Sequence, residues 1–437
     1  IFILYKKRFM EYNKYMKTLC NFRLGLLIMI FLTCFVGNLV AKGASDSAVD
    51  PVQLIKTELK AGLDEKQAFE KVVAEYGSVI ETQKGKNFIF TFLFYNEGGI
   101  IDEEIILHTN LLPQSSLQTM SMIKGTQIYY TDVKVKEKPD YITYAFQASA
   151  IFLSDQYNPY VWSDGRKSSY IRVAENTGAI AVAKDFYPKG KYEVLSNRIN
   201  YIYLPAAYFA NPDQEFPVIY MLDAQNIWDN KDCAWNGWKV DTIMEKLVAE
   251  GKMEPCIIAG ISNSSQRTHE YAGWCRELPP GESRGGSKNY TQHFSEHEAM
   301  ILDDFIPYVE ANYRVKAGKE NRAIIGSSYG AFYGAYMITR HPDVFGKAGL
   351  FSGGSTGYTE IIADDLVKDS SVQIYLDCGA GDGLETTLLP GTEAFLEYLK
   401  TKGYVEEENL MYRFVANHSH NERCWAERLP DCLDFLF

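Results

Sequence analysis

Residues 326–330 read Gly-Ser-Ser-Tyr-Gly, and their types and spacing point most directly to chemistry. The apolar run 323–325 precedes them, and small and aromatic residues follow at 331–335. A G-x-S-x-G pentapeptide between a strand and a helix projects its central serine above a sheet, beside the N–H groups that open the helix. This context predicts Ser328 as a nucleophile. The pentapeptide alone also occurs by chance, so a base and an acid must accompany it.

Two histidines are candidates for the base. In α/β-hydrolases the chain order is serine, then acid, then histidine, and this order excludes the four histidines that precede Ser328. His341 belongs to a His-Pro-Asp turn that ends a helix. His418 and His420 remain, and both lie in a polar loop after the strand-like run 410–415.

The acid of the triad is expected within residues 376–383, where an apolar strand ends and a glycine-rich loop begins. Asp377 and Asp382 are the two candidates there. Asp382 is favoured because it lies deeper in the loop, at the carboxyl edge where catalytic groups gather in such sheets. Asp377 is expected to support the loop through backbone hydrogen bonds.

The elements that position these residues alternate between strand and helix. This alternation predicts an α/β fold with a mostly parallel sheet that helices cover on both faces. The expected strands lie at 201–204, 218–222, 256–261, 322–325 and 372–376, and the expected helices at 240–249, 299–311, 331–339 and 391–401.

The part of the chain before residue 170 has a different pattern of apolar and polar residues. Apolar residues recur at helical spacing between 50 and 76, which predicts a helical segment within 50–82. Short β-branched and aromatic runs with polar turns then predict a small β-sandwich over 85–165. The turn-rich passage around 155–166 is the expected boundary, and 170–437 is the expected catalytic domain.

Residues 1–43 have the order of a secretory signal, with basic residues first and an apolar run from 24 to 40. Small residues at 41 and 43 favour cleavage before Ala44, and an uncleaved anchor is the alternative. The chain begins with Ile1, and Met16 is a more natural start, so the first 15 residues are interpreted as an extension. A secreted or periplasmic protein is expected.

The net charge of −12 repels nucleic acid and anionic membrane surfaces, so neither is an expected partner. No metal or other cofactor is expected. His293 and His297 match an H-x-x-E-H zinc motif, but they lie in a polar stretch without an evident third ligand. For Cys233 and Cys275 a disulfide is the first hypothesis and buried thiols are the alternative.

Several further matches accompany the pentapeptide in a consistent order. They are the strand and loop 218–226, Arg267 with Glu270-Tyr271, residues 379–382, and His420 followed five residues later by Trp425. With these marks the chain resembles the putative esterase family of the α/β-hydrolase superfamily, which includes enterochelin esterases, feruloyl esterases and esterase D. The resemblance covers nearly all of residues 85–437.

This resemblance implies His420 rather than His418 as the base and again favours Asp382 as the acid. It also implies an oxyanion hole made by the backbone N–H groups of Gln225 and Tyr329. Ala224 departs from the usual glycine of the family, in the loop next to that hole. The β-rich segment 85–165 is similar to the immunoglobulin-like module that precedes the hydrolase domain in enterochelin esterases.

The expected activity is therefore that of a serine esterase, with a small-molecule or polysaccharide ester as substrate. Removal of feruloyl, acetyl or similar groups from a polysaccharide is favoured, because export and acidity suit a neutral polymer. A siderophore trilactone esterase and a non-catalytic glycan-binding protein are the alternatives. Four tryptophans either form an aromatic wall for substrate or pack in the core. They are Trp228, Trp235, Trp238 and Trp274.

Arg267 and Glu270 are interpreted as an ion pair that fixes a loop, with substrate binding as the alternative.

Overall fold

The computed structural model describes residues 49–113, 116–158, 160, 168–174, 176–183, 186, 198–229, 233–275, 290–368 and 370–437. The predicted signal segment, residues 1–43, lies outside these ranges. Within them, no helix combines the length and the apolar character needed to cross a membrane.

Two helices form where the helical spacing between 50 and 76 predicted them, α2 (Pro51–Lys60) and α3 (Glu65–Tyr76). The side chain of Asp50 accepts a hydrogen bond from the third helical residue of α2, and Asp64 forms a capping box with Gln67 at the start of α3. Their apolar faces pack against one side of the first sheet, in a cluster that includes Ile55, Phe69, Ile80, Leu93 and Ile128.

Two antiparallel sheets share one core in the β-rich segment. The first has the order β1 (Val79–Lys84), β2 (Asn87–Tyr95), β6 (Ile128–Val135), β5 (Ser121–Met122). The second has the order β4 (Gln118–Thr119), β3 (Ile105–Thr109), β7 (Tyr141–Ala148), β8 (Ile151–Leu153), and β9 (Ser169–Arg172) also pairs with β7. Phe90 and Phe92 of the first sheet and Leu107 and Phe146 of the second are buried in the same cluster. The segment is therefore a β-sandwich, and its immunoglobulin-like character stays a prediction.

An eight-stranded sheet forms the larger core. Its order is β10 (Ala179–Val182), β11 (Tyr201–Leu204), β13 (Ile257–Ile261), β12 (Val218–Leu222), β14 (Arg322–Ser327), β15 (Lys347–Phe351), β16 (Gln373–Gly379), β17 (Leu410–Val415). The pairs from β13 through β17 are parallel, whereas β10 and β11 are antiparallel to their neighbours. Every residue of β12 and β13 is buried, as expected for strands covered on both faces.

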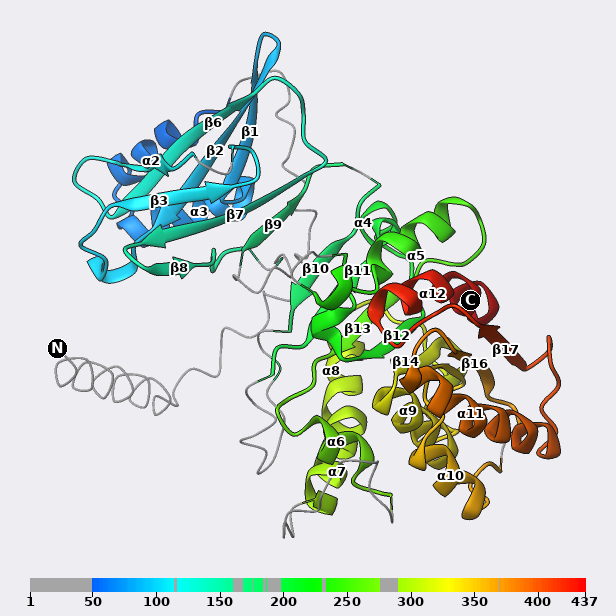
Figure 1. Cartoon of the computed structure of the whole chain (residues 1–437). Coiled ribbons are helices and arrows are strands. Elements are labelled where there is room, and N and C mark those ends of the chain that lie inside the picture. The colour runs from blue at the N-terminus through cyan, green and yellow to red at the C-terminus, as the bar shows by residue number, and fades with distance from the viewer. Residues whose placement is uncertain are drawn as a thin grey trace. The chain divides into compact units, whose positions relative to one another are not determined.

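Helices cover this sheet on both sides (Figure 1). On one face α5 (Val240–Ala249) and α12 (Glu422–Leu436) pack against alternate strand residues such as Met221, Ile325 and Tyr375. On the other face α9 (Tyr329–Arg340) approaches Ile324 and Leu350 at Gly334. Next to α9 on that face lie α10 (Thr356–Ala363) and α11 (Gly383–Thr401). The remaining helices are α4 (Ala206–Ala210), α6 (Arg267–Ala272), α7 (Tyr290–Ala299) and α8 (Ile306–Asn312), and a π-helical turn at Met300–Phe305 joins the last two.

The carboxyl ends of the parallel strands all lie at one edge of the sheet, because parallel neighbours run in the same direction. Asp223 follows β12, Ser328 follows β14, Ser352 follows β15, Asp382 follows β16 and His420 follows β17. Residues that are up to 197 positions apart in sequence, the interval from Asp223 to His420, are thereby gathered at the edge where α/β proteins bind ligands.

Candidate active site

Ser328 occupies the sharp turn between β14 and α9 and has φ 55° and ψ −123°. Positive φ is uncommon for a residue with a side chain and marks strain that the surroundings must hold in place. Its N–H donates to the carbonyl oxygen of Phe351 (2.9 Å), and its own carbonyl oxygen accepts from the N–H of Ala331 (3.0 Å). This is the geometry of a nucleophile elbow, which presents a half-buried serine at the carboxyl edge of the sheet.

The two glycines of the pentapeptide have unequal roles. A Cβ atom at Gly326 would lie 2.7 Å from the carbonyl carbon of Gly330, so the strand can approach the helix this closely only without a side chain. A Cβ atom at Gly330 would lie 3.5 Å from its nearest neighbours in Leu222 and Asp223, which is ordinary contact. The turn therefore requires Gly326, and Gly330 places the start of α9 beside the loop after β12.

The loop after β12 carries Gln225, whose N–H is a predicted oxyanion donor. Asp223 opens this loop in the left-handed conformation, and residues 224–226 form a 3-10 turn. The Gln225 side-chain oxygen accepts from the N–H of Asn263 (3.3 Å), and its carbonyl oxygen accepts from the Cys233 thiol (3.2 Å). These bonds hold the loop next to the elbow.

Ala224, at the position where the resemblance implied a glycine, is accommodated by a glycine on the neighbouring strand. Ala224 is fully buried, and a Cβ atom at Gly260 of β13 would lie 2.8 Å from the Ala224 methyl carbon. The space that Gly260 leaves open is therefore the space that Ala224 fills.

Arg267 and Glu270 both form ion pairs, but with other residues than the sequence interpretation gave them. Arg267 makes a bidentate pair with Asp223, with two nitrogen–oxygen distances of 2.8 Å. Glu270 pairs with Arg198, and both side chains are buried. The predicted Arg267–Glu270 pair is wrong in its partners, although Arg267 does fix the loop after β12.

His420 contacts two carboxylates, one through its ring and one through its backbone. The ring Nδ1 lies 3.2 Å from Oε1 of Glu385, and the backbone N–H donates to Oδ2 of Asp382 (2.7 Å). The indole of Trp425 meets the imidazole edge to face, with ring centroids 4.9 Å apart. The ring is thereby oriented from two sides, by Glu385 and by Trp425.

Glu385 lies in the first turn of α11, and its side chain is fully buried. Its Oε2 accepts from the backbone N–H of Gly379 (2.7 Å) and from the Cys378 thiol (3.1 Å). Burial raises the pKa of this carboxyl, but hydrogen bonds from His420, Ser352 and Gly379 outweigh burial and lower the pKa to about 2. Glu385 is therefore an ionised carboxylate that faces the histidine ring.

Asp382 caps α11 and joins two loops. Its Oδ1 accepts from the N–H of Glu385 (2.9 Å), while its Oδ2 binds the backbone of His420. Burial raises the pKa of Asp382, and these two backbone hydrogen bonds more than compensate, so that the net shift is downward. In this structure the carboxylate of Asp382 contacts the main chain of His420, and the ring contact belongs to Glu385.

The other candidates for acid and base are engaged elsewhere. Asp377 is buried in an ion pair with Arg428 (2.9 Å) and accepts from the N–H of Ser352 (3.0 Å), in keeping with its expected supporting role. His418 pairs through Nε2 with Glu427 on α12 (3.1 Å).

The sequence pattern around Glu385 would have indicated a buried carboxylate if the start of its helix had been predicted correctly. The expected helix began at residue 391, after Pro390, whereas α11 begins at Gly383 and runs through Pro390. From the true start, Glu385 lies on the same face as the apolar stripe of the helix. The buried residues of that face are Glu385, Leu388, Thr392, Phe395, Leu396 and Leu399. A charged residue at a core position of a helix would have marked a functional carboxylate.

The four tryptophans have different environments. Trp228 and Trp238 belong to the core cluster beneath α5 and α12. Trp274 is half-buried and packs on Tyr336, with ring centroids 4.8 Å apart. Trp235 is 61% exposed and lies in the short 3-10 turn Ala234–Asn236, further along the chain than the loop after β12. Trp235 is therefore the most exposed of the four tryptophans, and Trp228 and Trp238 pack in the core.

Within the part of the chain that the structure describes, cysteines and histidines do not gather into a cluster that suits a metal. Among the described residues no group of three or more His, Cys, Asp or Glu side chains could hold a metal ion. His297 of the H-x-x-E-H motif is buried and contacts the Tyr333 hydroxyl (2.9 Å). Cys233 and Cys275 are buried thiols rather than a disulfide.

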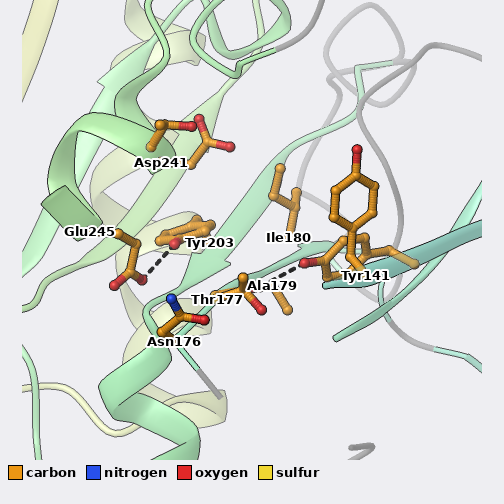
Figure 2. A pocket seen from close by; sticks show the side chains of 11 residues that line it. Tyr141, Asn176, Thr177, Ala179, Ile180, Tyr203, Asp241 and Glu245 are labelled. Carbon is orange, nitrogen blue, oxygen red and sulfur yellow. Dashed lines mark hydrogen bonds between the residues drawn. The ribbon is translucent and has the colours of Figure 1, made fainter. Parts of the chain in front are cut away.

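A separate cavity lies at the antiparallel end of the large sheet. Figure 2 shows this cavity of about 230 Å³, where the Tyr203 hydroxyl donates to Glu245 (2.6 Å). Its lining includes none of the predicted catalytic residues. Among the other lining residues are Tyr141, Tyr170, Asn176, Thr177, Ile180 and Asp241.

The parallel sheet and the strained serine at its carboxyl edge define a protein of the α/β-hydrolase type. The family described as Putative esterase matches residues 195–436, and the chain belongs to this family.

Two curated relatives are similar to part of the chain. The endo-1,4-beta-xylanase/feruloyl esterase of Xylanibacter ruminicola is 27% identical over 268 residues, which cover 60% of this chain and 30% of the relative. The protein YbbA of Bacillus subtilis, described as uncharacterized, is 24% identical over 250 residues, which cover 55% of this chain and 93% of that protein. The chain thus spans under a third of the first relative and nearly all of the second.

Two solved structures are also similar. A ferulic acid esterase has a TM-score of 0.43 and 22% identity, with coverage of 60% of this chain and 98% of that one. The ferric enterobactin esterase of Salmonella typhimurium has a TM-score of 0.44 and 14% identity, with coverage of 82% and 96%.

Proposed function

We propose that this protein is a serine carboxylic-ester hydrolase in which Ser328 is the nucleophile, His420 the general base and Glu385 the acid that orients it. The observation that carries the proposal is the buried, ionised Glu385 facing the ring of His420 at the sheet edge where Ser328 stands in the elbow conformation. A hydroxyl, an imidazole and a carboxylate together are the groups needed for acyl transfer.

In the proposed mechanism His420 takes the proton of the Ser328 hydroxyl, and the oxygen attacks the ester carbonyl carbon. The oxyanion accepts hydrogen bonds from the backbone N–H groups of Gln225 and Tyr329, each worth about 2.7–4 kcal/mol in the transition state. His420 then protonates the leaving alcohol. A water molecule gives its proton to His420, attacks the acyl-enzyme and releases the acid, which regenerates Ser328.

The roles of the two carboxylates follow from the atoms they contact. Glu385 touches Nδ1, so it fixes the tautomer that leaves Nε2 as the base and stabilises the imidazolium that forms. Asp382 holds the main chain of the same residue and caps the helix that carries Glu385. Asp382 is therefore proposed as a positioning residue.

For the substrate, we propose a neutral ester such as a feruloyl or acetyl group on a polysaccharide. The xylanase/feruloyl esterase relative supports this class by its name. The local charge also supports it. Glu422, the first residue of α12, accepts from the Asn226 side chain (3.3 Å), so its half-buried carboxylate lies between the oxyanion loop and the loop of His420. Carboxylates in this position disfavour an anionic substrate.

The alternatives have less support. A ferric catecholate trilactone is strongly anionic, whereas the nearby Arg267 is already paired with Asp223. A glycan-binding protein without catalysis would not need the ionised Glu385 or the strained Ser328. Export through residues 1–43 and an immunoglobulin-like role for the sandwich belong to the same proposal and agree with a polymer substrate outside the cell.

The test is hydrolysis of p-nitrophenyl acetate, methyl ferulate, acetylated xylan and ferric enterobactin by the wild type and by Ser328→Ala. We expect serine-dependent release from ferulate or xylan. Activity that persists in folded Ser328→Ala would remove Ser328 from the mechanism. Preferential cleavage of enterobactin would assign the trilactone instead, and inactivity on all four esters would favour the binding protein.

A further inference from the structure

We propose that Ser352 is a positioning residue, whose buried hydroxyl holds Glu385 and Trp425 in the places from which they orient His420. This inference rests on the proposed function. It adds a residue that lies outside the pentapeptide and outside the loops of the acid and the base.

Ser352 is the first residue after β15 and is fully buried. It has φ 50°, in the left-handed region. Its N–H donates to Oδ1 of Asp377 (3.0 Å) and to the carbonyl oxygen of the same residue (3.1 Å). A positive φ at a buried serine persists only where the surroundings fix it, and here Asp377 does so.

The hydroxyl of Ser352 accepts two hydrogen bonds. Its oxygen accepts from Nε1 of Trp425 (3.0 Å) and from Nη2 of Arg428 (2.8 Å). A hydroxyl has two acceptor sites and one donor, so its proton remains for a third partner. We infer that Glu385 is this partner, because a hydrogen bond from Ser352 contributes to the lowered pKa of Glu385, after the larger effects of burial and of His420.

This arrangement places one hydroxyl behind both groups that contact the imidazole. Glu385 faces Nδ1 of His420, and the ring of Trp425 packs against the same imidazole. Loss of the hydroxyl would leave a buried carboxylate and a buried indole N–H each with one partner fewer. The ring of His420 would then be less closely fixed in the orientation that removes a proton from Ser328.

A buried ion pair anchors the hydroxyl from behind. Nε of Arg428 donates to Oδ2 of Asp377 (2.9 Å), and both side chains are nearly inaccessible to solvent. Arg428 thus contacts Asp377 and Ser352 at once. A buried network of hydrogen bonds around an ion pair restricts the positions of these side chains.

The same strand end also holds the elbow. The carbonyl oxygen of Phe351, the residue before Ser352, accepts from the N–H of Ser328. Phe351 therefore holds the nucleophile, and the next residue, Ser352, holds the acid. The positions of Ser328 and Glu385 are linked through these two consecutive residues at the end of β15.

The experiment is a double-mutant cycle between Ser352→Ala and Glu385→Gln, with kcat and KM for methyl ferulate or p-nitrophenyl acetate. We expect Ser352→Ala to lower kcat on the order of 10- to 100-fold with little change in KM, as second-layer partners of functional groups typically do. In the Glu385→Gln background the same change should lower kcat by less than about threefold. Ser355→Ala is the matched control, because the Ser355 hydroxyl on the same loop has no hydrogen-bond partner among the described residues.

Equal losses in both backgrounds, a loss confined to KM, or an unchanged kcat would overturn the inference. If Ser352→Ala does not fold, Trp425→Phe replaces it, since phenylalanine keeps a ring against His420 and removes the donor to Ser352. Its loss of kcat should likewise disappear in Glu385→Gln, and an additive loss would overturn the inference. Folded Ser328→Ala that remains active would instead refute the proposed function, so the two failures are distinguishable.

Discussion

The Nδ1 atom of His420 lies 3.2 Å from Oε1 of Glu385, and the Oδ2 atom of Asp382 lies 2.7 Å from the backbone nitrogen of the same histidine. The two carboxylates are three positions apart in sequence, yet they hold different parts of one residue. This difference makes their contributions to catalysis and stability separable by mutation.

Glu385→Gln should lower kcat by about 10²- to 10⁴-fold, because an amide can present a donor to Nδ1 and stabilise the wrong tautomer. Asp382→Asn should retain much more activity, because asparagine also caps helices well. Kinetics on p-nitrophenyl acetate with purified, folded variants compares the two. A larger loss in Asp382→Asn than in Glu385→Gln would reverse the proposed roles.

The stability of the protein should depend on Glu385 at acid pH. The folded pKa of about 2 is below the ordinary value of about 4.3, so ionised Glu385 stabilises the fold above pH 4.3, and this contribution is lost as pH falls toward 2. The total is about 3 kcal/mol. Urea unfolding of wild type and Glu385→Gln from pH 6 to pH 2.5 measures it, and the difference between the two proteins should shrink as pH falls. Asp377 titrates in the same range, because burial raises its pKa to about 6 and the charge of Glu385 also raises it.

Glu422→Gln should favour anionic substrates. Removal of the carboxylate next to Asn226 reduces repulsion, so kcat/KM for an anionic ester relative to a neutral one should rise about three- to tenfold at low ionic strength. Glu427→Gln, on the same helix, is the control, because Glu427 is exposed and pairs with His418. The ratio is measured with mono-p-nitrophenyl succinate as the anionic ester and p-nitrophenyl acetate as the neutral one. An equal change of this ratio in both variants would count against a specific effect of Glu422.

Gly326→Ala and Gly330→Ala should differ sharply. The first places a methyl group 2.7 Å from backbone carbon and should destabilise the protein by at least about 1–3 kcal/mol or prevent folding. The second makes ordinary contacts at 3.5 Å and should fold. Thermal unfolding and soluble yield distinguish them, and similar values for both variants would contradict the steric account of the elbow.

Trp235→Ala should change substrate binding without changing stability, since Trp235 is 61% exposed. We expect the free energy of unfolding to stay within about 0.5 kcal/mol and KM for methyl ferulate or xylan to rise several-fold. Trp238→Ala, in the core, should instead lower stability by about 3–5 kcal/mol. An unchanged KM in Trp235→Ala would remove Trp235 from the substrate site.

The sequence predicted the parts of the site that depend on local pattern. A strand, a G-x-S-x-G turn and a helix follow one another within a few residues, so this local pattern alone predicts that Ser328 lies at an elbow. The parallel sheet likewise follows from alternating strand and helix. Family resemblance, rather than local pattern, favours His420 over His418, and it is the ring of His420 that contacts Glu385.

Other features depend on contacts that local pattern does not specify. Pro390 and Gly391 are residues that usually interrupt a helix, so the sequence predicts a helix that starts after them and excludes Glu385. The burial of Trp228 and Trp238 depends on which side of each loop packs against α5 and α12. Loops have no regular spacing of apolar residues from which this side could be predicted. The partners of Arg267 and Glu270 come from distant segments, and charge alone could not assign them.

The contact between Ala224 and Gly260 has a consequence for how such sequences can diverge. The space between β13 and the loop after β12 holds one methyl group, so an alanine fits at position 224 or at position 260 but not at both. A homologue with glycine at the first position has more room for alanine at the second. The two positions should therefore vary together across homologues, as a pair coupled by shared volume rather than by charge or catalysis.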